Sequence, residues 1–253
     1  MSALARTPSR SGLHGEVDLA TLGALIADRT RATFLLSLLG GGLTPASALA
    51  ARAGVSASLA SNHLRKLSDG GLIIAERRGR QRLYRLASAA IADALEALIS
   101  VAPPGQEQSL RGVRARDSLR RGRLCYDHLA GRAGVAIADG LLTRGWLLEA
   151  DGDYQVTAAG ALGLGSIGVD VRTLSARARP LTRACMDWSE QRPHLAGSVG
   201  AALTAELQRR GWLQSPEASR AARVTDEGRH ALHAWLGLDP RVFELAGEAV
   251  RAA

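Results

Sequence analysis

Two cysteines and two histidines form the set of side chains in this sequence that is best suited to bind a metal ion. Cys125 and His128 stand three positions apart, and Cys185 and His194 follow later in the chain. On a helix, residues three positions apart lie on the same side. Two thiols with two imidazoles make an acceptable tetrahedral zinc set. The four residues are therefore candidate metal ligands, provided that the fold brings the two pairs together.

Other roles for these side chains remain open. Free cysteine is among the most buried residue types, so both thiols could fill the core while each imidazole hydrogen-bonds a carbonyl or carboxylate. The thiols could also carry a redox signal. With Trp188 beside Cys185 and Met186, they could instead line a pocket for a small molecule. The sequence specifies no cofactor with certainty, and the candidate effectors are a metal ion, a small molecule or a thiol oxidant.

The candidate ligands lie in a region that repeats itself. Cys-x-Asp, His-Leu-Ala-Gly and Gly-Trp-Leu occur twice in the same order, and the spacing from His128 to Gly145 equals that from His194 to Gly211. Each unit is predicted to hold a helix, the Gly-Trp-Leu exit, a two-stranded hairpin and a further helix, like a degenerate winged helix. The first hairpin, at residues 149–153, is acidic and would repel phosphates. We therefore expect the units, about 109–172 and 173–253, to serve sensing or assembly.

Residues 49–67 have the pattern of two short helices joined by a tight turn. Their apolar residues recur at intervals that keep one face turned inward, Gly54 fits the turn, and Ser56 is a good N-cap for the second helix. The outer face of this helix carries side chains that can reach phosphates and base edges in the major groove, and together with Ser56 at the capped end they are the expected DNA-binding residues of the helix: Ser58, Ser61, Asn62 and Arg65. The segment predicts a helix-turn-helix that binds duplex DNA.

A basic hairpin follows the two helices. Residues 73–76 and 83–86 are predicted to be strands, with the turn at 77–80. Between Arg52 and Arg85 there are eight Lys or Arg against two acids, so 8 − 2 = +6 of the chain's net charge of +8 falls on this motif. We expect Arg78, Arg80 and Arg82 to contact DNA phosphates.

These segments resemble the ArsR-type winged-helix repressors. The recognition segment of that family reads Ser-x-Ser-x-x-Ser-x-His-Leu-x-x-Leu and its wing Arg-x-Gly-Arg-x-x-x-Tyr, and residues 56–67 and 77–84 match both. The resemblance adds His63 and Tyr84 to the expected DNA-binding residues. It implies a homodimer, joined by helices at about 19–39 and 89–101, that represses transcription and leaves its near-palindromic operator when an effector binds. The family's usual metal sites have no counterpart, because no cysteine precedes residue 125 and residues 89–101 contain no histidine.

The expected fold is mainly α with small β-hairpin wings. We expect a flexible arm at 1–15, a winged helix-turn-helix for DNA binding and dimerisation at 16–102, a linker at 103–108 and a sensor domain at 109–253. Two cysteines exclude a disulfide framework, and no stretch has the apolar length of a membrane span, so we expect a cytoplasmic protein without a membrane partner.

The sequence thus predicts a DNA-binding transcriptional regulator, a homodimeric repressor released by an effector. Two alternatives are an enzyme tethered to DNA by its amino-terminal module and a ligand-free scaffold that binds another protein. The second half has no nucleophile elbow, no carboxylate pair around a cleft and no metalloprotease signature, so we expect no enzyme.

Overall fold

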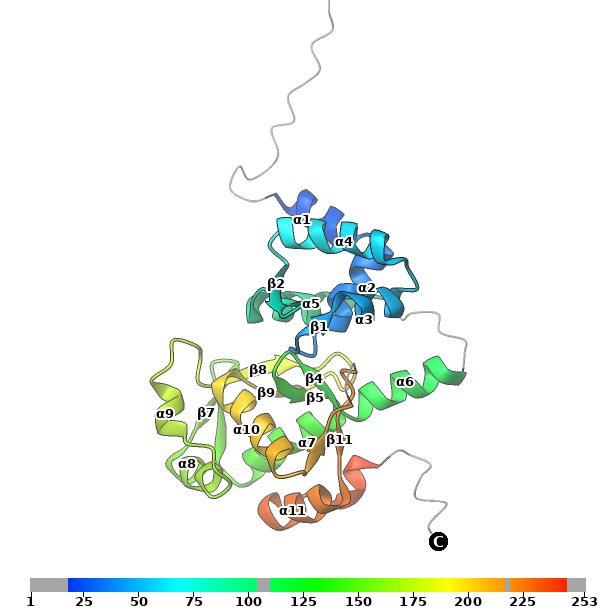
Figure 1. The fold of residues 1–253 in the computed structure, drawn as a ribbon. Helices are drawn as coiled ribbons and strands as arrows, with labels where there is room; N and C mark the ends of the chain where they lie inside the picture. The colour runs from blue at the N-terminus through cyan, green and yellow to red at the C-terminus, as the bar shows by residue number, and fades with distance from the viewer. Residues whose placement is uncertain (1–17, 104–109, 217–218, 245–253) are drawn as a thin grey trace, which may run out of the picture.

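The computed structural model describes residues 18–103, 110–216 and 219–244, which are mostly helical with small antiparallel sheets (Figure 1). The arm expected at 1–15 and the linker expected at 103–108, except for its first residue, lie outside the described residues. In the described part of the chain, no helix combines the length and the apolar composition that a membrane crossing requires.

The amino-terminal part is a winged helix-turn-helix. Its elements are α1 (Leu19–Ile26), α2 (Arg29–Leu38), β1 (Thr44–Pro45), α3 (Ala46–Ala53), α4 (Ala57–Asp69), β2 (Ile73–Arg78), β3 (Gln81–Leu86) and α5 (Ala89–Val101). Their inward apolar faces form one core, with Phe34, Leu49, Leu64 and Leu86 among its fully buried residues. The apolar spacing of 49–67 is thus confirmed as the inner face of α3 and α4.

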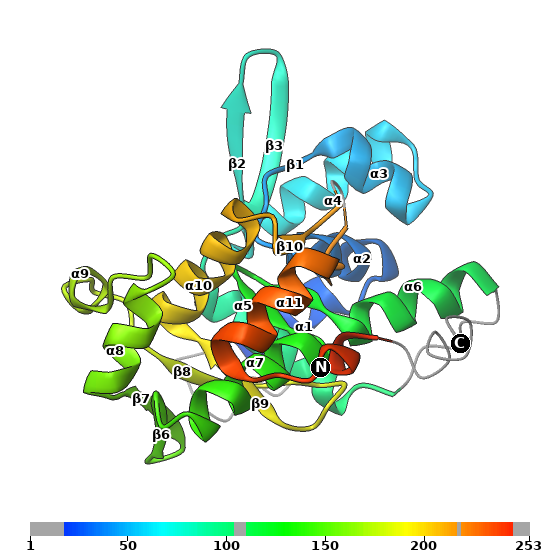
Figure 2. The same cartoon turned by 90° about the horizontal axis from the view of Figure 1, so that it is seen from below.

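The wing is longer than the sequence predicted. Strands β2 and β3 pair as far as Arg78 opposite Gln81, so the turn contains Gly79 and Arg80 alone. Gly79 has φ +60°, and glycine at the first position of a two-residue turn closes a hairpin tightly. Figure 2 shows this hairpin standing out from the body beside α3 and α4.

The carboxyl-terminal part repeats one order of elements. The first set is α6 (Leu110–Arg121), β4 (Arg123–Cys125), β5 (His128–Ala130), α7 (Gly131–Thr143), β6 (Leu147–Ala150), β7 (Asp153–Val156) and α8 (Ala158–Gly165). The second set is α9 (Val171–Ser175), β8 (Arg183–Met186), β9 (Pro193–Ala196), α10 (Gly197–Arg209), β10 (Leu213–Gln214), β11 (Arg223–Val224) and α11 (Asp226–Leu236), followed by the short helix η1 (Pro240–Phe243). The region is therefore one of helices and hairpins, as expected.

The two sets also share hydrogen bonds. Thr157 and Thr225 each cap the helix that follows, and each hydroxyl also donates to the glycine carbonyl of the preceding Gly-Trp-Leu, at 2.8 and 2.9 Å. The expected path from helix through Gly-Trp-Leu to a hairpin and a further helix is confirmed in both sets. The hairpins β4–β5 and β8–β9, which precede the long helices, were not predicted.

Candidate functional site

The polar edge of α4 lies open to solvent. Ser56 caps the helix by accepting from the backbone N–H of Leu59 at 3.3 Å, which confirms the predicted N-cap. Four other residues expected to contact DNA are exposed along the helix: Ser58, Ser61, Asn62 and Arg65. Arg65 lies 3.4 Å from the amide oxygen of Asn62. The edge thus offers hydroxyl, amide and guanidinium groups on a rigid helix.

The wing presents a concentrated positive charge. Arg77, Arg78, Arg80 and Arg82 are exposed, and none of them has an acidic partner among the described residues, whereas Arg85 pairs with Glu76 at 2.7 Å. Arg77 stands directly opposite Arg82 in the strand pair. Like charges in such cross-strand positions repel each other, so a bound anion would relieve the repulsion.

Two of the expected DNA-binding residues face inward. The His63 side chain is 12% exposed, lies 3.4 Å from the Asp28 carboxylate and meets the Phe34 ring edge-on. Tyr84 is 4% exposed, and the Arg82 guanidinium lies 5.5 Å from the centre of its ring. Neither side chain is open to a DNA phosphate, so both residues pack beneath the exposed surface and do not make the direct contacts that were expected of them.

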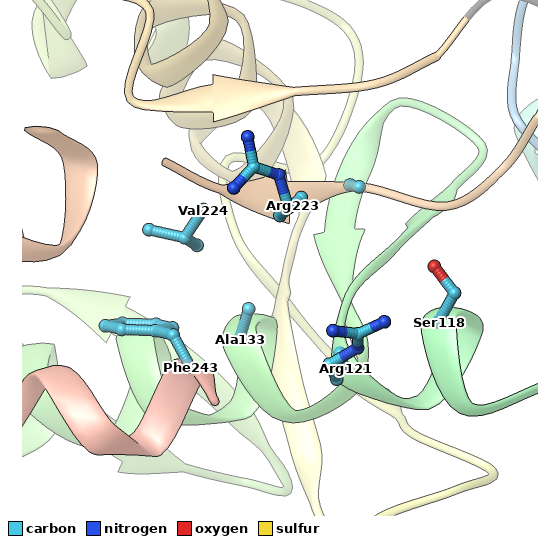
Figure 3. A pocket seen from close by; sticks show the side chains of 7 residues that line it. Ser118, Arg121, Ala133, Arg223, Val224 and Phe243 are labelled. Atoms are coloured by element: carbon cyan, nitrogen blue, oxygen red, sulfur yellow. The ribbon is translucent and has the colours of Figure 1, made fainter. Parts of the chain in front are cut away.

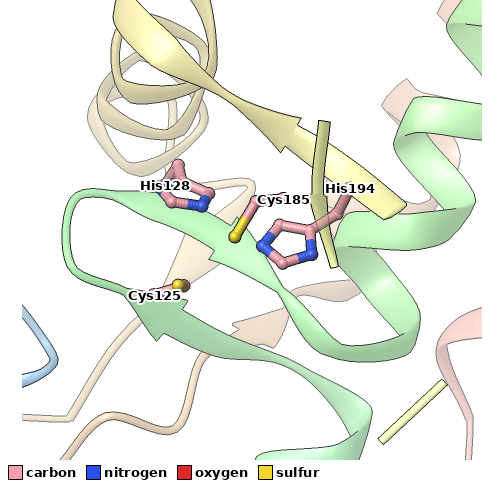
Figure 4. Close-up of side chains that lie close together, drawn as sticks. All are labelled: Cys125, His128, Cys185 and His194. Carbon is pink, nitrogen blue, oxygen red and sulfur yellow. The ribbon is translucent and has the colours of Figure 1, made fainter. Parts of the chain in front are cut away.

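The four candidate metal ligands meet at one buried point. The ligand atoms of Cys125, His128, Cys185 and His194 all lie within 4.8 Å of one another, and all four residues are buried. Figure 4 shows them approaching one another from two hairpins. The convergence that the sequence left open is therefore present.

The expected helix at residues 125–128 is wrong. Cys125 ends β4 and His128 begins β5, so the two residues are cross-strand partners, as are Cys185 and His194 in β8–β9. The chain reverses at Tyr126 and Asp127, with Tyr126 at φ +63°. Tyr-Asp is not one of the dipeptides that usually indicate a two-residue hairpin turn, so the sequence did not predict this hairpin.

Each long helix packs on the hairpin of the other set. Helix α7 contacts β9, and α10 contacts β5. A Cβ added to Gly134 of α7 would lie 3.6 Å from the His194 Cβ, and one added to Gly200 of α10 would lie 3.4 Å from the His128 Cβ. This reciprocal packing places the two imidazoles side by side, with ring centres 5.1 Å apart.

A carboxylate stands behind each imidazole. His128 Nδ1 lies 3.4 Å from an Asp127 oxygen, and His194 Nδ1 lies 3.6 Å from an Asp187 oxygen. The Nε2 atoms of both rings and the Nδ1 atom of His194 are buried and have no hydrogen-bond partner. Sequence reasoning missed both aspartates, although the repeated Cys-x-Asp was a signal that could have identified them.

The electrostatics of the cluster favour a thiolate at one cysteine. A hydrogen bond with Cys125 lowers the pKa of Cys185 against the effect of burial, and the two imidazoles act in the same direction. The same hydrogen bond, together with burial, raises the pKa of Cys125. Burial opposes a charge on His128, but Asp127 and Cys185 outweigh it and raise the pKa of that imidazole. These directions favour the loss of a proton from Cys185 before Cys125.

A fully buried arginine connects the cluster to the amino-terminal part. Arg123 lies 3.0 Å from Asp187 and 3.8 Å from Glu96 of α5. Burial raises the pKa of Asp187, but the charge of Arg123, the hydrogen bonds from Ser189 and the backbone of Gly131, and the nearby His194 together outweigh burial and lower the pKa to about 2. The Trp188 ring covers the Arg123 guanidinium at 4.6 Å, so Trp188 shields an ion pair where the sequence had suggested a pocket wall.

The cavity between α6, α7, β11 and η1 is small (Figure 3). It is lined by Ser118, Arg121, Ala133, Ala222, Arg223, Val224 and Phe243 and measures about 30 Å³. That volume accommodates about one or two water molecules. This cavity is too small for an organic effector.

Known proteins match this chain in two ways. The sequence model of a family described as "Helix-turn-helix domain" matches residues 26–75. YdfF of Bacillus subtilis, described as an uncharacterised HTH-type transcriptional regulator, is 36% identical over 221 residues, which are 87% of this chain and 98% of that protein. The HTH-type transcriptional regulator CmtR of Mycobacterium tuberculosis is 44% identical over 86 residues, which are 34% of this chain and 72% of that protein.

Two solved structures are similar to about a third of this chain. The NMR structure of the cadmium metal-sensor CMTR from Mycobacterium tuberculosis is 40% identical and covers 36% of this chain and 96% of its own, with a TM-score of 0.29. A winged helix-turn-helix fragment from Mycobacterium bovis, described as a possible ArsR-family transcriptional regulator, is 31% identical and covers 35% and 88%, with a TM-score of 0.30.

The similarity to the Bacillus regulator runs through nearly the whole of both chains and includes the region beyond the winged helix. Both of these relatives are named as HTH-type transcriptional regulators. Residues 56–84 carry the recognition and wing pattern on an exposed helix and hairpin. The chain therefore belongs to the ArsR family of helix-turn-helix transcriptional regulators, with an additional carboxyl-terminal region.

Proposed function

We propose that this protein is a homodimeric repressor that leaves a near-palindromic operator when an effector binds to its carboxyl-terminal region. We assign residues 16–102 to DNA binding and dimerisation. Residues 109–253 are then the sensor domain, built of two degenerate winged-helix-like units at about 109–172 and 173–253. The observation that carries the proposal is the exposed polar edge of α4 beside a wing in which Arg77, Arg78, Arg80 and Arg82 are exposed and have no acidic partner among the described residues.

The exposed edge of α4 and the wing contact different parts of the DNA in this proposal. Helix α4 has the length and polarity to enter the major groove, where Asn62 and Arg65 can reach base edges while the serines contact phosphates. The wing arginines supply charge to the DNA backbone, and each phosphate contact releases bound counterions from the duplex. Binding is therefore expected to weaken steeply with salt.

Exposed apolar residues on α1 and α5 support a dimer. Leu19 of α1 is 73% exposed, and Leu98 and Val101 of α5 are 48% and 79% exposed. A second copy of the chain would bury these side chains, and the family pattern places the dimer interface on the same helices. The dimer would then present two α4 helices to successive major grooves.

An effector acts in this scheme by population shift. It binds more tightly to a dimer whose α4 helices are misaligned, while DNA prefers the aligned dimer. A coupling free energy of about 1–3 kcal/mol is enough for a useful switch. The enzyme and scaffold alternatives have no specific observation in their favour.

Fluorescence anisotropy with the DNA upstream of the protein's own gene tests the proposal. Arg80→Ala and Arg82→Ala are each expected to weaken binding and to reduce the slope of log affinity against log salt by about 1. Arg241→Ala, which removes a charge from a side chain that is 79% exposed in η1, is the matched control. Wild-type protein that fails to protect any site in a footprint of that DNA, or wing variants with unchanged affinity and slope, would refute the proposal.

A further inference from the structure

We propose that Cys125, His128, Cys185 and His194 form a binding site for one divalent ion of the zinc class, and that this ion is the effector. The second half of this statement rests on the proposed repressor function. The first half concerns the carboxyl-terminal region alone and stands or falls independently of DNA.

The geometry is close to that of a loaded site. In a tetrahedral zinc site, bond lengths of about 2.0–2.3 Å set neighbouring ligand atoms about 3.3–3.8 Å apart. Here all four ligand atoms already lie within 4.8 Å of one another. Side-chain movements of about 1 Å would bring the four ligand atoms to the separations of a tetrahedral zinc site.

The imidazoles are oriented as metal ligands are. His128 is 2% exposed and His194 is fully buried, yet both Nε2 atoms lack a hydrogen-bond partner. Leaving a buried polar atom without a partner is unfavourable, and a metal ion at this point would supply the partner that both Nε2 atoms lack. His128 Nδ1 hydrogen-bonds the Asp127 carboxylate at 3.4 Å, whereas His194 Nδ1 lies 3.6 Å from Asp187 without a hydrogen bond. Histidines that bind a metal commonly donate their other ring N–H to a carboxylate, and Asp127 and Asp187 stand at the positions that would accept it.

The alternatives explain less of this arrangement. A disulfide between Cys125 and Cys185 would use the thiols and leave both Nε2 atoms without a partner. A purely apolar role for the cysteines accounts for neither the paired imidazoles nor the carboxylates behind them. A metal ion satisfies all four donors together.

The donor set defines the class of ion. Two thiolates with two imidazoles suit zinc and similar soft or borderline ions in tetrahedral geometry, and they disfavour magnesium and calcium, which prefer oxygen ligands. All four ligands come from the protein, which is the pattern of a closed site that holds an ion and performs no chemistry on a bound water.

The site is in direct contact with the DNA-binding part. The turn between Cys125 and His128 packs against the winged-helix core through Tyr126. From the other hairpin, Asp187 pairs with Arg123, which approaches Glu96 on α5, and Arg220 pairs with the same glutamate at 2.6 Å. Drawing the two hairpins together around an ion would therefore shift contacts with the winged-helix core and with α5.

Metal titration of the purified full chain tests the site. After treatment with a chelator, we expect the wild-type protein to bind one Zn²⁺ per chain, and one Co²⁺ with the absorption spectrum of a tetrahedral thiolate site. Cys125→Ser and Cys185→Ser should each weaken binding by about 10²-fold or more. His230→Gln changes an exposed histidine of α11 and should bind like the wild type.

Thermal unfolding of the metal-free forms shows whether each variant is folded. For a folded variant, Zn²⁺ should raise the melting temperature of the wild type and of His230→Gln but not that of the cysteine variants. Wild-type protein that binds no ion, or cysteine variants that bind the ion normally, would refute the metal site. So would wild-type protein that forms a Cys125–Cys185 disulfide and binds no Zn²⁺.

Operator binding with and without Zn²⁺ separates the two halves of the proposal. We expect Zn²⁺ to lower the DNA affinity of the wild type and of His230→Gln by about 10-fold, and to leave the cysteine variants unaffected. Normal metal binding with unchanged DNA affinity would refute the effector role while the site remains. Absence of any DNA binding, with normal metal titration, would refute the repressor function alone.

Discussion

The backbone N–H of Tyr126 donates a hydrogen bond to the carbonyl oxygen of Leu39, the C-cap residue that follows helix α2. The same turn lies so close to Gly41 that a Cβ added there would sit 2.0 Å from the Tyr126 carbonyl oxygen. A segment of the winged helix thus fits tightly against the hairpin that carries two of the candidate metal ligands.

Gly41→Ala is expected to loosen this contact. Alanine at φ +71° is strained by about 1–2 kcal/mol, and its methyl group would push the turn away. We expect lower stability in urea unfolding and a smaller response of DNA affinity to Zn²⁺. Gly42→Ala is the control, because nothing lies within 4 Å of a Cβ there. If Gly41→Ala and Gly42→Ala show the same response of DNA affinity to Zn²⁺, this contact does not couple the metal site to DNA binding.

Asn62→Ala is expected to change sequence preference more than overall affinity. The amide is exposed on α4 and can bond base edges, so its loss should cost about 1–3 kcal/mol at one operator position and little on unrelated DNA. Binding measured on operators substituted at single positions checks this. Ser68→Ala, on the same helix but half-buried, should leave the preference intact. An equal loss of affinity for all DNA sequences would indicate that Asn62 contacts the phosphates and not the base edges.

Arg123→Met is expected to destabilise the protein by about 3–5 kcal/mol, because it leaves the buried Asp187 without its cation. Arg192→Met breaks the pair with Asp139, in which the arginine is 59% exposed, and should cost about 1 kcal/mol or less. Urea unfolding of both variants measures the difference. Similar losses would mean that Asp187 is neutral or solvated in the folded protein.

Leu19→Lys and Leu98→Lys are expected to weaken the proposed dimer. Burial of a leucine contributes about 1.5–3 kcal/mol, so each change should raise the dimer dissociation constant by about 10-fold or more. Leu162→Lys, at a position of α8 that is 79% exposed, is the control. Sedimentation across a range of concentrations gives the constants. Dimers of equal strength in all three variants would place the interface elsewhere.

The sequence predicted the features that depend on local patterns. Apolar spacing, the Ser56 cap and Gly54 identified the helix-turn-helix, since each of these signals acts within a few residues. The repeat located the second hairpins because Gly-Trp-Leu and the capping threonines recur in both units.

The first hairpins could not be predicted in the same way. The turn at Tyr126 has no glycine or asparagine to mark its positive φ, so the three-residue spacing of Cys125 and His128 suggested a helix. The meeting of the four ligands depends on α7 and α10 packing on each other's hairpins, and such long-range packing leaves no local pattern. The inward orientation of His63 likewise results from contacts with Asp28 and Phe34 in other segments.

The reciprocal packing at Gly134 and Gly200 makes the cluster a shared property of both repeats. Each repeat contributes one cysteine sulfur and one histidine nitrogen to the cluster. The long helix of each repeat also packs against the histidine of the other repeat. Neither repeat can assemble the four donors alone. A protease cut or truncation that removes one repeat would therefore abolish the whole cluster at once, without leaving a weaker half-site behind.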